Sequence, residues 1–195
     1  MNTKSAISTL IKEVPDPSLG LPEDVFYYIS RTTPLLNVDL LIKDECGRTL
    51  LSWRDDPYTG EGWHIPGGIV RFKESLESRV TKVAQTEIGT SIQFDPVPIA
   101  VHQSIHNERE IRGHFISFLY KCFLPSTFKP ANKEMSYKDR GYLFWHASCP
   151  ENLLGVHEIY KKFINNLHDQ HDPKKEQTGM NLLNECQTVR TERIL

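Results

Sequence analysis

The chain has 195 residues, enough for one domain with a sizeable core and a tail. Its formal net charge is -2, so no overall positive field points to nucleic acid. The apolar runs are too short to cross a bilayer, and the polar N-terminus has no apolar core of a secretory signal. We therefore expect neither a nucleic-acid partner nor a membrane partner.

Residues 1–20 are predicted to form a weakly ordered lead, after which Pro22 opens a helix that runs to about Ser30. Proline costs little in the first turn of a helix, and the two acids that follow it face the positive end of the helix dipole. The apolar runs 35–42 and 49–53 flank a turn and predict a β-hairpin. A loop rich in glycine and proline is expected at 55–62.

A second helix is predicted over 75–88 because its apolar residues recur at helical spacing, and Gly89 is a natural stop. Further expected elements are strands at 92–101, 114–124 and 142–146, and a last helix at 150–167. Helices before, between and after the strands predict an α/β domain over 21–168 with a mixed sheet. A polar C-terminal tail is expected at 169–195.

The four cysteines are spread along the chain without a Cys-x-x-Cys pair: Cys46, Cys122, Cys149 and Cys186. Wide spacing of this kind favours reduced thiols and does not suit a zinc site. We therefore expect a cytoplasmic protein with free thiols.

The most informative stretch is Trp-His-Ile-Pro-Gly-Gly at 63–68, followed by Glu74 and by Glu87-Ile-Gly. Paired glycines let the backbone come close to a ligand. A helix behind such a turn can present carboxylates to a metal ion. The pattern therefore predicts a ligand site built on a glycine turn and a helix.

The spacing of this stretch resembles the signature of the Nudix hydrolases. Five residues separate Gly68 from Glu74, seven separate Glu74 from Lys82, and Glu87-x-Gly follows. The resemblance implies the Nudix α/β/α sandwich with a mixed sheet, and hydrolysis of a nucleotide-linked substrate with a divalent cation.

Two acids of the usual signature are missing, because Val83 and Thr86 stand in their places. Carboxylates crowded within two helix turns repel one another unless cations neutralise them, so fewer acids hold fewer ions. We expect one Mg²⁺ or Mn²⁺, bound by the Gly67 carbonyl and Glu87. Glu74 is a further candidate, either as a direct metal ligand or as its support.

The reduced signature resembles that of one Nudix branch, the GDP-mannose mannosyl hydrolases, which keep the acid at Glu87 but not those at Val83 and Thr86. The resemblance extends upstream to Asp39 and Arg54, where that branch has an acid and an arginine that contact substrate. It implies a nucleoside diphosphate sugar as substrate, displacement of the nucleoside diphosphate from sugar C1, and a homodimer.

The general base is the least determined role. His102 and His106 lie on one side of an expected strand end, and histidine titrates near neutrality, so His106 is the first candidate. The loop 133–140, where the branch has its histidine base, contains none; Glu134 and Asp139 are the carboxylate candidates there.

Each candidate also has a structural alternative. Glu87 could be a solvated acid at a helix end, and Glu74 could favour the helix start. Arg54 could pair with a neighbouring aspartate, and Asp39 could be a hydrogen-bonded structural acid. Two other functions stay open: pyrophosphate cleavage of a nucleotide, and nucleotide-sugar binding without turnover.

Overall fold

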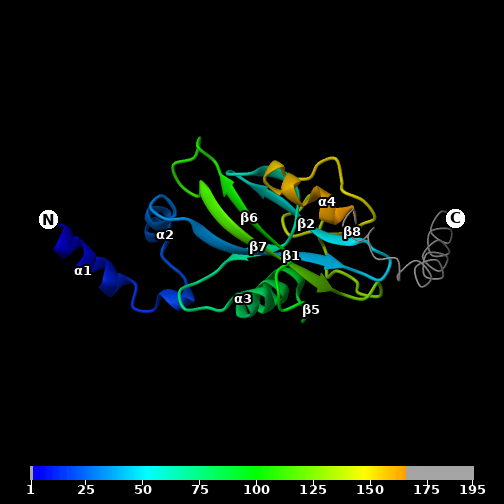
Figure 1. Ribbon diagram of the computed structural model, residues 1–195, viewed down its shortest axis with the longest axis horizontal. Helices are drawn as coiled ribbons and strands as arrows, with labels where there is room; N and C mark the ends of the chain where they lie inside the picture. Colours follow the sequence, from blue (N-terminus) through cyan, green and yellow to red (C-terminus); the bar gives the residue numbers. More distant parts are fainter. Residues whose placement is uncertain (1, 166–195) are drawn as a thin grey trace. The chain divides into compact units, whose positions relative to one another are not determined.

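The computed structural model describes residues 2–165, in which helices precede, separate and follow two runs of strands (Figure 1). The α-helices are α1 (Thr3–Glu13), α2 (Glu23–Ser30), α3 (Leu76–Val83) and α4 (Lys161–Ile164), and the 3-10 or π-helical turns are η1 (Pro17–Leu19), η2 (Ala84–Ile88) and η3 (Gly155–Tyr160). The strands are β1 (Leu35–Lys43), β2 (Thr49–Asp56), β3 (Gly60–His64), β4 (Gly67–Ile69), β5 (Gln93–Phe94), β6 (Ala100–Ile105), β7 (His114–Phe123) and β8 (Leu143–His146).

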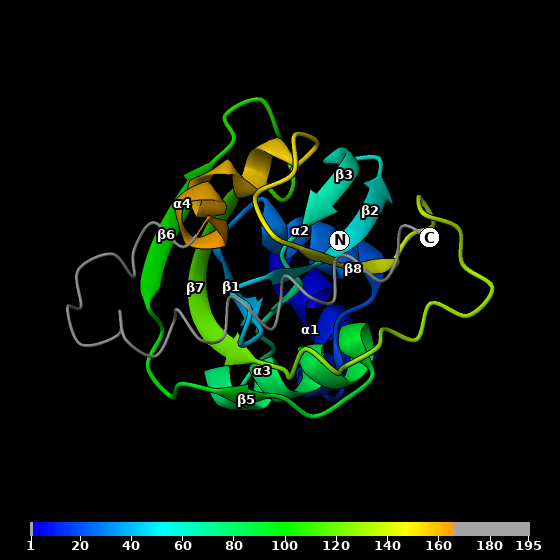
Figure 2. The same ribbon diagram turned by 90° about the vertical axis from the view of Figure 1, so that its right-hand side faces the viewer.

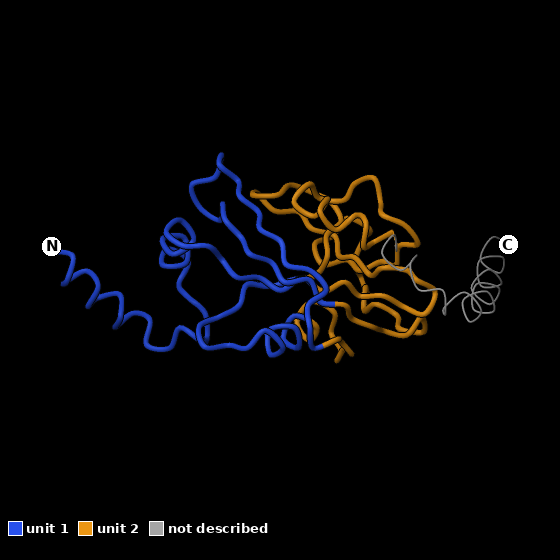
Figure 3. Tube along the Cα trace, viewed as in Figure 1, with its two compact units in different colours: residues 1–39, 67–83, 96–120 blue, residues 40–66, 84–95, 121–195 orange. Residues whose placement is uncertain are grey.

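Hydrogen bonds connect the strands in the order β3-β2-β1-β7-β5, with β4 on β1, β6 on β7 and β8 on β2. The expected α/β class with a mixed sheet is thereby confirmed. By its internal packing the chain divides into two compact units (Figure 3). Of the described residues, unit 1 holds 2–39, 67–83 and 96–120, and unit 2 holds 40–66, 84–95 and 121–165.

In unit 1, β4 pairs antiparallel with the first half of β1, and β6 pairs antiparallel with β7. The β1–β4 register places Asp39 opposite Gly67. The helix α3 follows β4 after a short loop. It turns three side chains into the core: Arg79, Val80 and Val83.

In unit 2, β2 pairs antiparallel with both β3 and β8, and these strands lie side by side in Figure 2. The two faces of the β2–β3 hairpin differ because successive side chains alternate. Trp53 and Trp63 are cross-strand neighbours on one face, both fully buried, with ring centroids 5.3 Å apart. The other face carries Ser52, Arg54 and His64.

Several expected elements are present with nearly the expected bounds: α2, the β1–β2 hairpin, α3 with its continuation η2, β7 and β8. Gly89 ends the helix with a φ of 81°, a backbone conformation in which a residue with a side chain would be strained. Within residues 2–165, none of the helices has the length and apolarity needed to cross a bilayer.

The N-terminal lead is more regular than expected, because Thr3–Glu13 forms α1 with the Asn2 side chain as its N-cap. Ile7, Leu10 and Ile11 recur at helical spacing, so this helix could have been read from the sequence, although none of its residues is buried. The loop expected at 55–62 is shorter, since both of its glycines belong to β3. The Asp56 carboxylate accepts the Tyr58 and Thr59 amides and closes the turn.

Two later expectations also need correction. The strand expected at 92–101 is split into β5 and β6, because prolines at 96 and 98 cannot donate to a ladder. The last helix starts only at Gly155, as a 3-10 turn, and the residues before it pair with β3. The tail expected at 169–195 lies outside the described residues.

The expectation of free thiols is confirmed for two cysteines of the described residues and is wrong for one. Cys46 is disulfide-bonded, whereas Cys122 and Cys149 are free. Burial raises the pKa of the Cys122 thiol to about 12, so this group is an unreactive part of the core.

Candidate active site

The two strands that carry the first candidates bring Asp39 against the glycine turn. A Cβ atom added to Gly67 would lie 2.3 Å from Asp39 Oδ1 and 2.8 Å from the Val38 carbonyl oxygen. The Asp39 side chain is buried, and Asn37 Nδ2 donates to its Oδ1 at 2.8 Å. Gly67 is therefore required for close approach, and a candidate substrate contact lies beside a candidate metal ligand.

The second glycine of the turn is required by α3. A Cβ atom at Gly68 would lie 2.8 Å from Val83 Cγ2 and 3.4 Å from Arg79 Cδ. Val83 is the residue that replaces an acid of the Nudix signature, and it is 3% exposed. The position that carries a carboxylate in the signature is thus filled here by an apolar contact with the turn.

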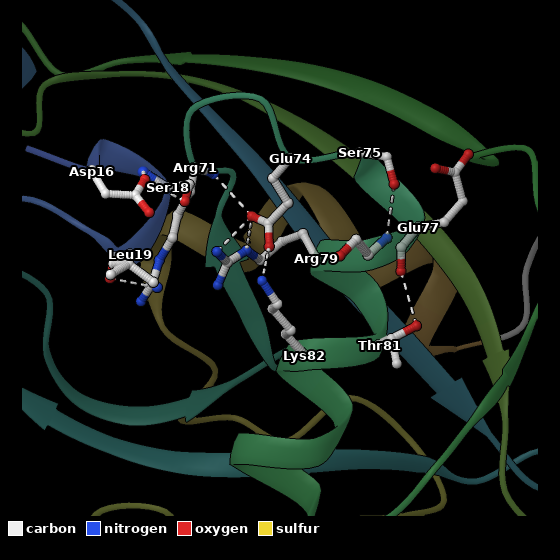
Figure 4. Close-up of polar contacts among 11 residues, drawn as sticks. Asp16, Ser18, Leu19, Arg71, Glu74, Ser75, Glu77, Arg79, Thr81 and Lys82 are labelled. Atoms are coloured by element: carbon white, nitrogen blue, oxygen red, sulfur yellow. Dashed lines mark hydrogen bonds and ion pairs between the residues drawn. The ribbon is translucent and has the colours of Figure 1, made fainter.

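Glu74 lies within a cluster of cationic groups, as Figure 4 shows. Its Oε2 accepts Arg79 Nε at 2.7 Å and the Arg71 amide at 3.0 Å, and Lys82 Nζ is 2.9 Å from Oε1. Burial opposes ionisation of this carboxyl, but the Arg71 amide, Lys82 and Arg79 outweigh it and lower its pKa to about 2. Glu74 is therefore held as an anion by the protein itself.

Sequence reasoning missed Arg79, which pairs with Glu74 and is itself buried. Its position five residues after Glu74, on the inner face of α3, was the available signal. Arg71 is also engaged, because its Nη1 donates to the Leu19 carbonyl at 2.7 Å and holds the segment before α2 (Figure 4).

Arg54 in unit 2 is accompanied by two histidines that the sequence did not single out as site residues. Its Nε is 3.5 Å from Asp56 Oδ2, so the expected pairing with a neighbouring aspartate is present. The His64 and His157 rings are 5.8 Å apart. Burial first, and then the Arg54 charge, lowers the pKa of both imidazoles, to about 3 for His157 and well below 6.5 for His64.

Both histidines are consequently neutral at physiological pH. His64 lies inside the Trp-His-Ile-Pro-Gly-Gly stretch, so its place next to the turn was visible in the sequence. His157 was not, because 92 residues separate it from the strand end that it contacts.

Glu87 lies in η2, a single π-helical turn in which the Gly89 amide donates to the Ala84 carbonyl at 3.0 Å. Turns of this kind occur often at functional sites. Its side chain is half-buried. Among residues 2–165, no three His, Cys, Asp or Glu side chains are grouped so that they could hold a metal ion.

The candidate ligands nevertheless have the donor atoms that a hard cation prefers. The Gly67 carbonyl and the carboxylates of Glu87 and Glu74 are oxygen donors, which Mg²⁺ and Mn²⁺ prefer. They are few, and Glu74 already has cationic partners. Oxygen donors of this kind suit one hard cation, and the metal assignment stays a prediction.

His106 lies in the turn between β6 and β7, with its amide bound to the Gly113 carbonyl at 2.7 Å. Its Nδ1 is 3.5 Å from Glu108 Oε1, so a carboxylate accompanies the candidate base. Of the other candidates, Asp139 Oδ2 accepts the Ser136 amide at 2.7 Å, and Glu134 has a left-handed backbone with φ of 63°. The assignment of the base stays a prediction.

No family model matches the chain. Over 113 residues it is 36% identical to the low-salt glycan biosynthesis protein Agl8 of Haloferax volcanii, and the match covers 55% of this chain and 70% of Agl8. The chain belongs to the Agl8 family.

Solved structures related to this member of the Agl8 family show the fold. A MutT NUDIX hydrolase from Burkholderia pseudomallei matches with a TM-score of 0.53 and 22% identity, covering 67% of this chain and 97% of that one. A possible asymmetric diadenosine tetraphosphate hydrolase from Jonesia denitrificans matches with a TM-score of 0.52 and 19% identity, covering 67% and 92%. The fold is that of the Nudix hydrolases, as the sequence resemblance implied.

Proposed function

We propose that this protein hydrolyses a nucleoside diphosphate sugar, GDP-mannose or a relative, by breaking the bond between sugar C1 and the diphosphate oxygen. The observation that carries the proposal is the packing of Val83 against Gly68, which fills an acid position of the Nudix signature with a methyl group. The part that Agl8 plays in glycan biosynthesis, by its name, supports a sugar-linked substrate.

In this proposal Arg54 lies beside the diphosphate and neutralises its oxygens as the leaving group departs. Asp39 accepts a hydrogen bond from the sugar. His106 is the base that removes a proton from the attacking water, with Asp139 and Glu134 as the alternatives. The products are a free sugar and a nucleoside diphosphate.

A single Mg²⁺ or Mn²⁺ would be held by the Gly67 carbonyl and Glu87, with Glu74 supporting the turn, and would draw negative charge from the departing diphosphate. We further propose that the protein acts in the cytoplasm as a homodimer.

Two other functions belong to different classes. Pyrophosphate cleavage would follow the substrate named for the Jonesia denitrificans relative, a diadenosine tetraphosphate. It is disfavoured because Val83 and Thr86 leave few carboxylates to aim water at phosphorus. Binding of a nucleotide sugar without turnover is the remaining alternative.

Product analysis in ¹⁸O-labelled water tests the proposal. Label in the free sugar, together with unlabelled GDP, supports attack at C1. Label in a phosphate indicates pyrophosphate cleavage. Absence of products from a panel of nucleotide sugars with Mg²⁺ and Mn²⁺, combined with measurable binding, indicates the binding module. The variant Glu87→Gln is expected to abolish metal-dependent turnover.

A further inference from the structure

The end of β3 is paired with the segment before η3 in unit 2. The Trp63 amide donates to the Asn152 carbonyl at 2.9 Å, and the Leu154 amide donates to the Trp63 carbonyl at 2.8 Å, which forms a parallel bridge. A Cβ atom at Gly62 would lie 2.7 Å from the Asn152 carbonyl oxygen, so a glycine there is needed for this approach. The backbone pairing therefore depends on the sequence of β3.

This pairing would continue at Ile65, two residues further along, but no backbone carbonyl takes that position. The chain turns away because the His157 amide donates to the Leu154 carbonyl at 2.8 Å and begins η3. Instead, the Ile65 amide donates to His157 Nδ1 at 2.9 Å. An imidazole nitrogen thus replaces the missing carbonyl of the ladder.

The other side of the same residue is held by a second imidazole. His64 Nδ1 lies 2.8 Å from the Ile65 carbonyl oxygen. A carbonyl can only accept, so His64 carries its proton on Nδ1. His157 accepts at Nδ1 and must carry its proton on Nε2. Both polar groups of the Ile65 backbone are therefore bound by histidine side chains with opposite tautomers.

Ile65 has a special place because Pro66 and the two glycines follow it directly. Proline has no amide hydrogen and restricts the residue before it to an extended backbone. The Pro66 carbonyl in turn accepts the Leu40 amide at 2.8 Å. The Ile65 backbone groups are thus the last amide and carbonyl before the turn.

We propose that His157 and His64 are positioning residues, which hold the Ile65 backbone and so fix the direction in which the chain enters the Pro-Gly-Gly turn. The consequence for catalysis rests on the function proposed above, whereas the positioning itself does not. The two histidines need no contact with substrate in this role.

A matched pair of variants tests the proposal in the full chain. In His157→Asn the amide oxygen takes the place of Nδ1 and can accept the Ile65 amide. In His157→Gln the oxygen lies one bond further out. The readout is amide hydrogen exchange at Ile65, Gly67 and Gly68, followed by NMR without substrate or metal.

We expect His157→Gln to speed exchange of the Ile65 amide about fivefold, since a lost hydrogen bond is worth about 1 kcal/mol. The two glycine amides should exchange faster as well. His157→Asn should stay close to the native rates. Unchanged Ile65 exchange in His157→Gln, equal effects of Asn and Gln, or an effect that stops at Ile65 would each overturn the proposal.

The pair His64→Asn and His64→Gln repeats the test at the other side of Ile65, and it covers the case in which His157→Gln does not fold. The amide nitrogen of Asn can replace the Nδ1 donor, whereas that of Gln is displaced. Faster exchange at Gly67 and Gly68 in His64→Gln alone supports positioning, and equal rates in both variants contradict it. A native protein without turnover would refute the proposed function and leave these exchange rates to decide the positioning role.

Discussion

The carboxylate of Asp39 occupies the space that a side chain at residue 67 would need, with Oδ1 only 2.3 Å from the Cβ position of Gly67. The two residues face each other across the β1–β4 ladder. Strand register therefore decides that an acid and a glycine of the turn meet. Substitution of Gly67 therefore tests what the fold requires at this place, apart from any binding at the site.

Gly67→Ala should destabilise the protein by about 1–3 kcal/mol, because its methyl group would overlap the Asp39 carboxylate and the Val38 carbonyl. Gly155→Ala is the control, since nothing lies within 4 Å of its Cβ position, and its effect should stay below about 1 kcal/mol. Urea unfolding measures both. Equal stability of the two variants would contradict the close approach.

Glu74→Gln should cost about 3 kcal/mol of stability without any metal present, because it leaves the Arg79 guanidinium, whose side chain is 11% exposed, without its anion. Glu77→Gln on the exposed side of the same helix is the control and should have little effect. Thermal unfolding in EDTA gives the comparison. A Glu74 that served only as a metal ligand would show no loss under these conditions.

Stability should fall as the pH is lowered from 6.5. Burial lowers the pKa of His146 to about 4 and that of His157 to about 3, and it also lowers the pKa of His64. The unfolded chain therefore binds protons that the folded chain does not, and the stability present above pH 6.5 is lost towards these lower values.

Each such histidine contributes a slope of about 1.4 kcal/mol per pH unit once its unfolded form is protonated. The free energy of unfolding in urea, measured between pH 5 and pH 7, checks the sign, and Glu74 adds to the loss only below 4.5, its usual pKa. His157→Asn should reduce this slope by the contribution of one proton, about 1.4 kcal/mol per pH unit. A stability that rises on acidification would show that the imidazoles are not buried as neutral groups.

Val83→Glu returns an acid to the signature and should destabilise the metal-free protein by about 3 kcal/mol, because Val83 is buried against Gly68. If a cation binds beside the turn, Mg²⁺ should recover part of this loss. Val80→Glu, equally buried on α3, is the control and should not respond to Mg²⁺. The measurement is thermal unfolding with Mg²⁺ and with EDTA; the same response in both variants would argue against a cation at this place.

Local signals in the sequence were sufficient for several elements. Pro22 and two acids predicted α2, apolar spacing predicted α3, and the turn at 44–47 predicted the first hairpin. These features depend on neighbours a few residues away, so they can be read without the fold. The α1 helix was missed although Ile7, Leu10 and Ile11 recur at helical spacing, which is a local signal of the same kind.

The candidate site was predictable only as separate residues. The glycine spacing pointed to Gly67, Glu74 and Glu87, but the partners of each depend on packing. Arg79 became the partner of Glu74 because the inner face of α3 turns towards it. His157 meets the end of β3 only after the chain has folded, and nothing near residue 157 announces that contact.

The hydrogen bond from Arg71 to the Leu19 carbonyl has a practical consequence for shortened versions of the protein. A chain that begins after residue 20 would lack this acceptor, and the loop between β4 and α3 would lose its anchor at the N-terminal side. The segment before α2 thus supports the loop that carries Glu74. Its removal should disturb the position of Glu74 more than the hairpin of β2 and β3.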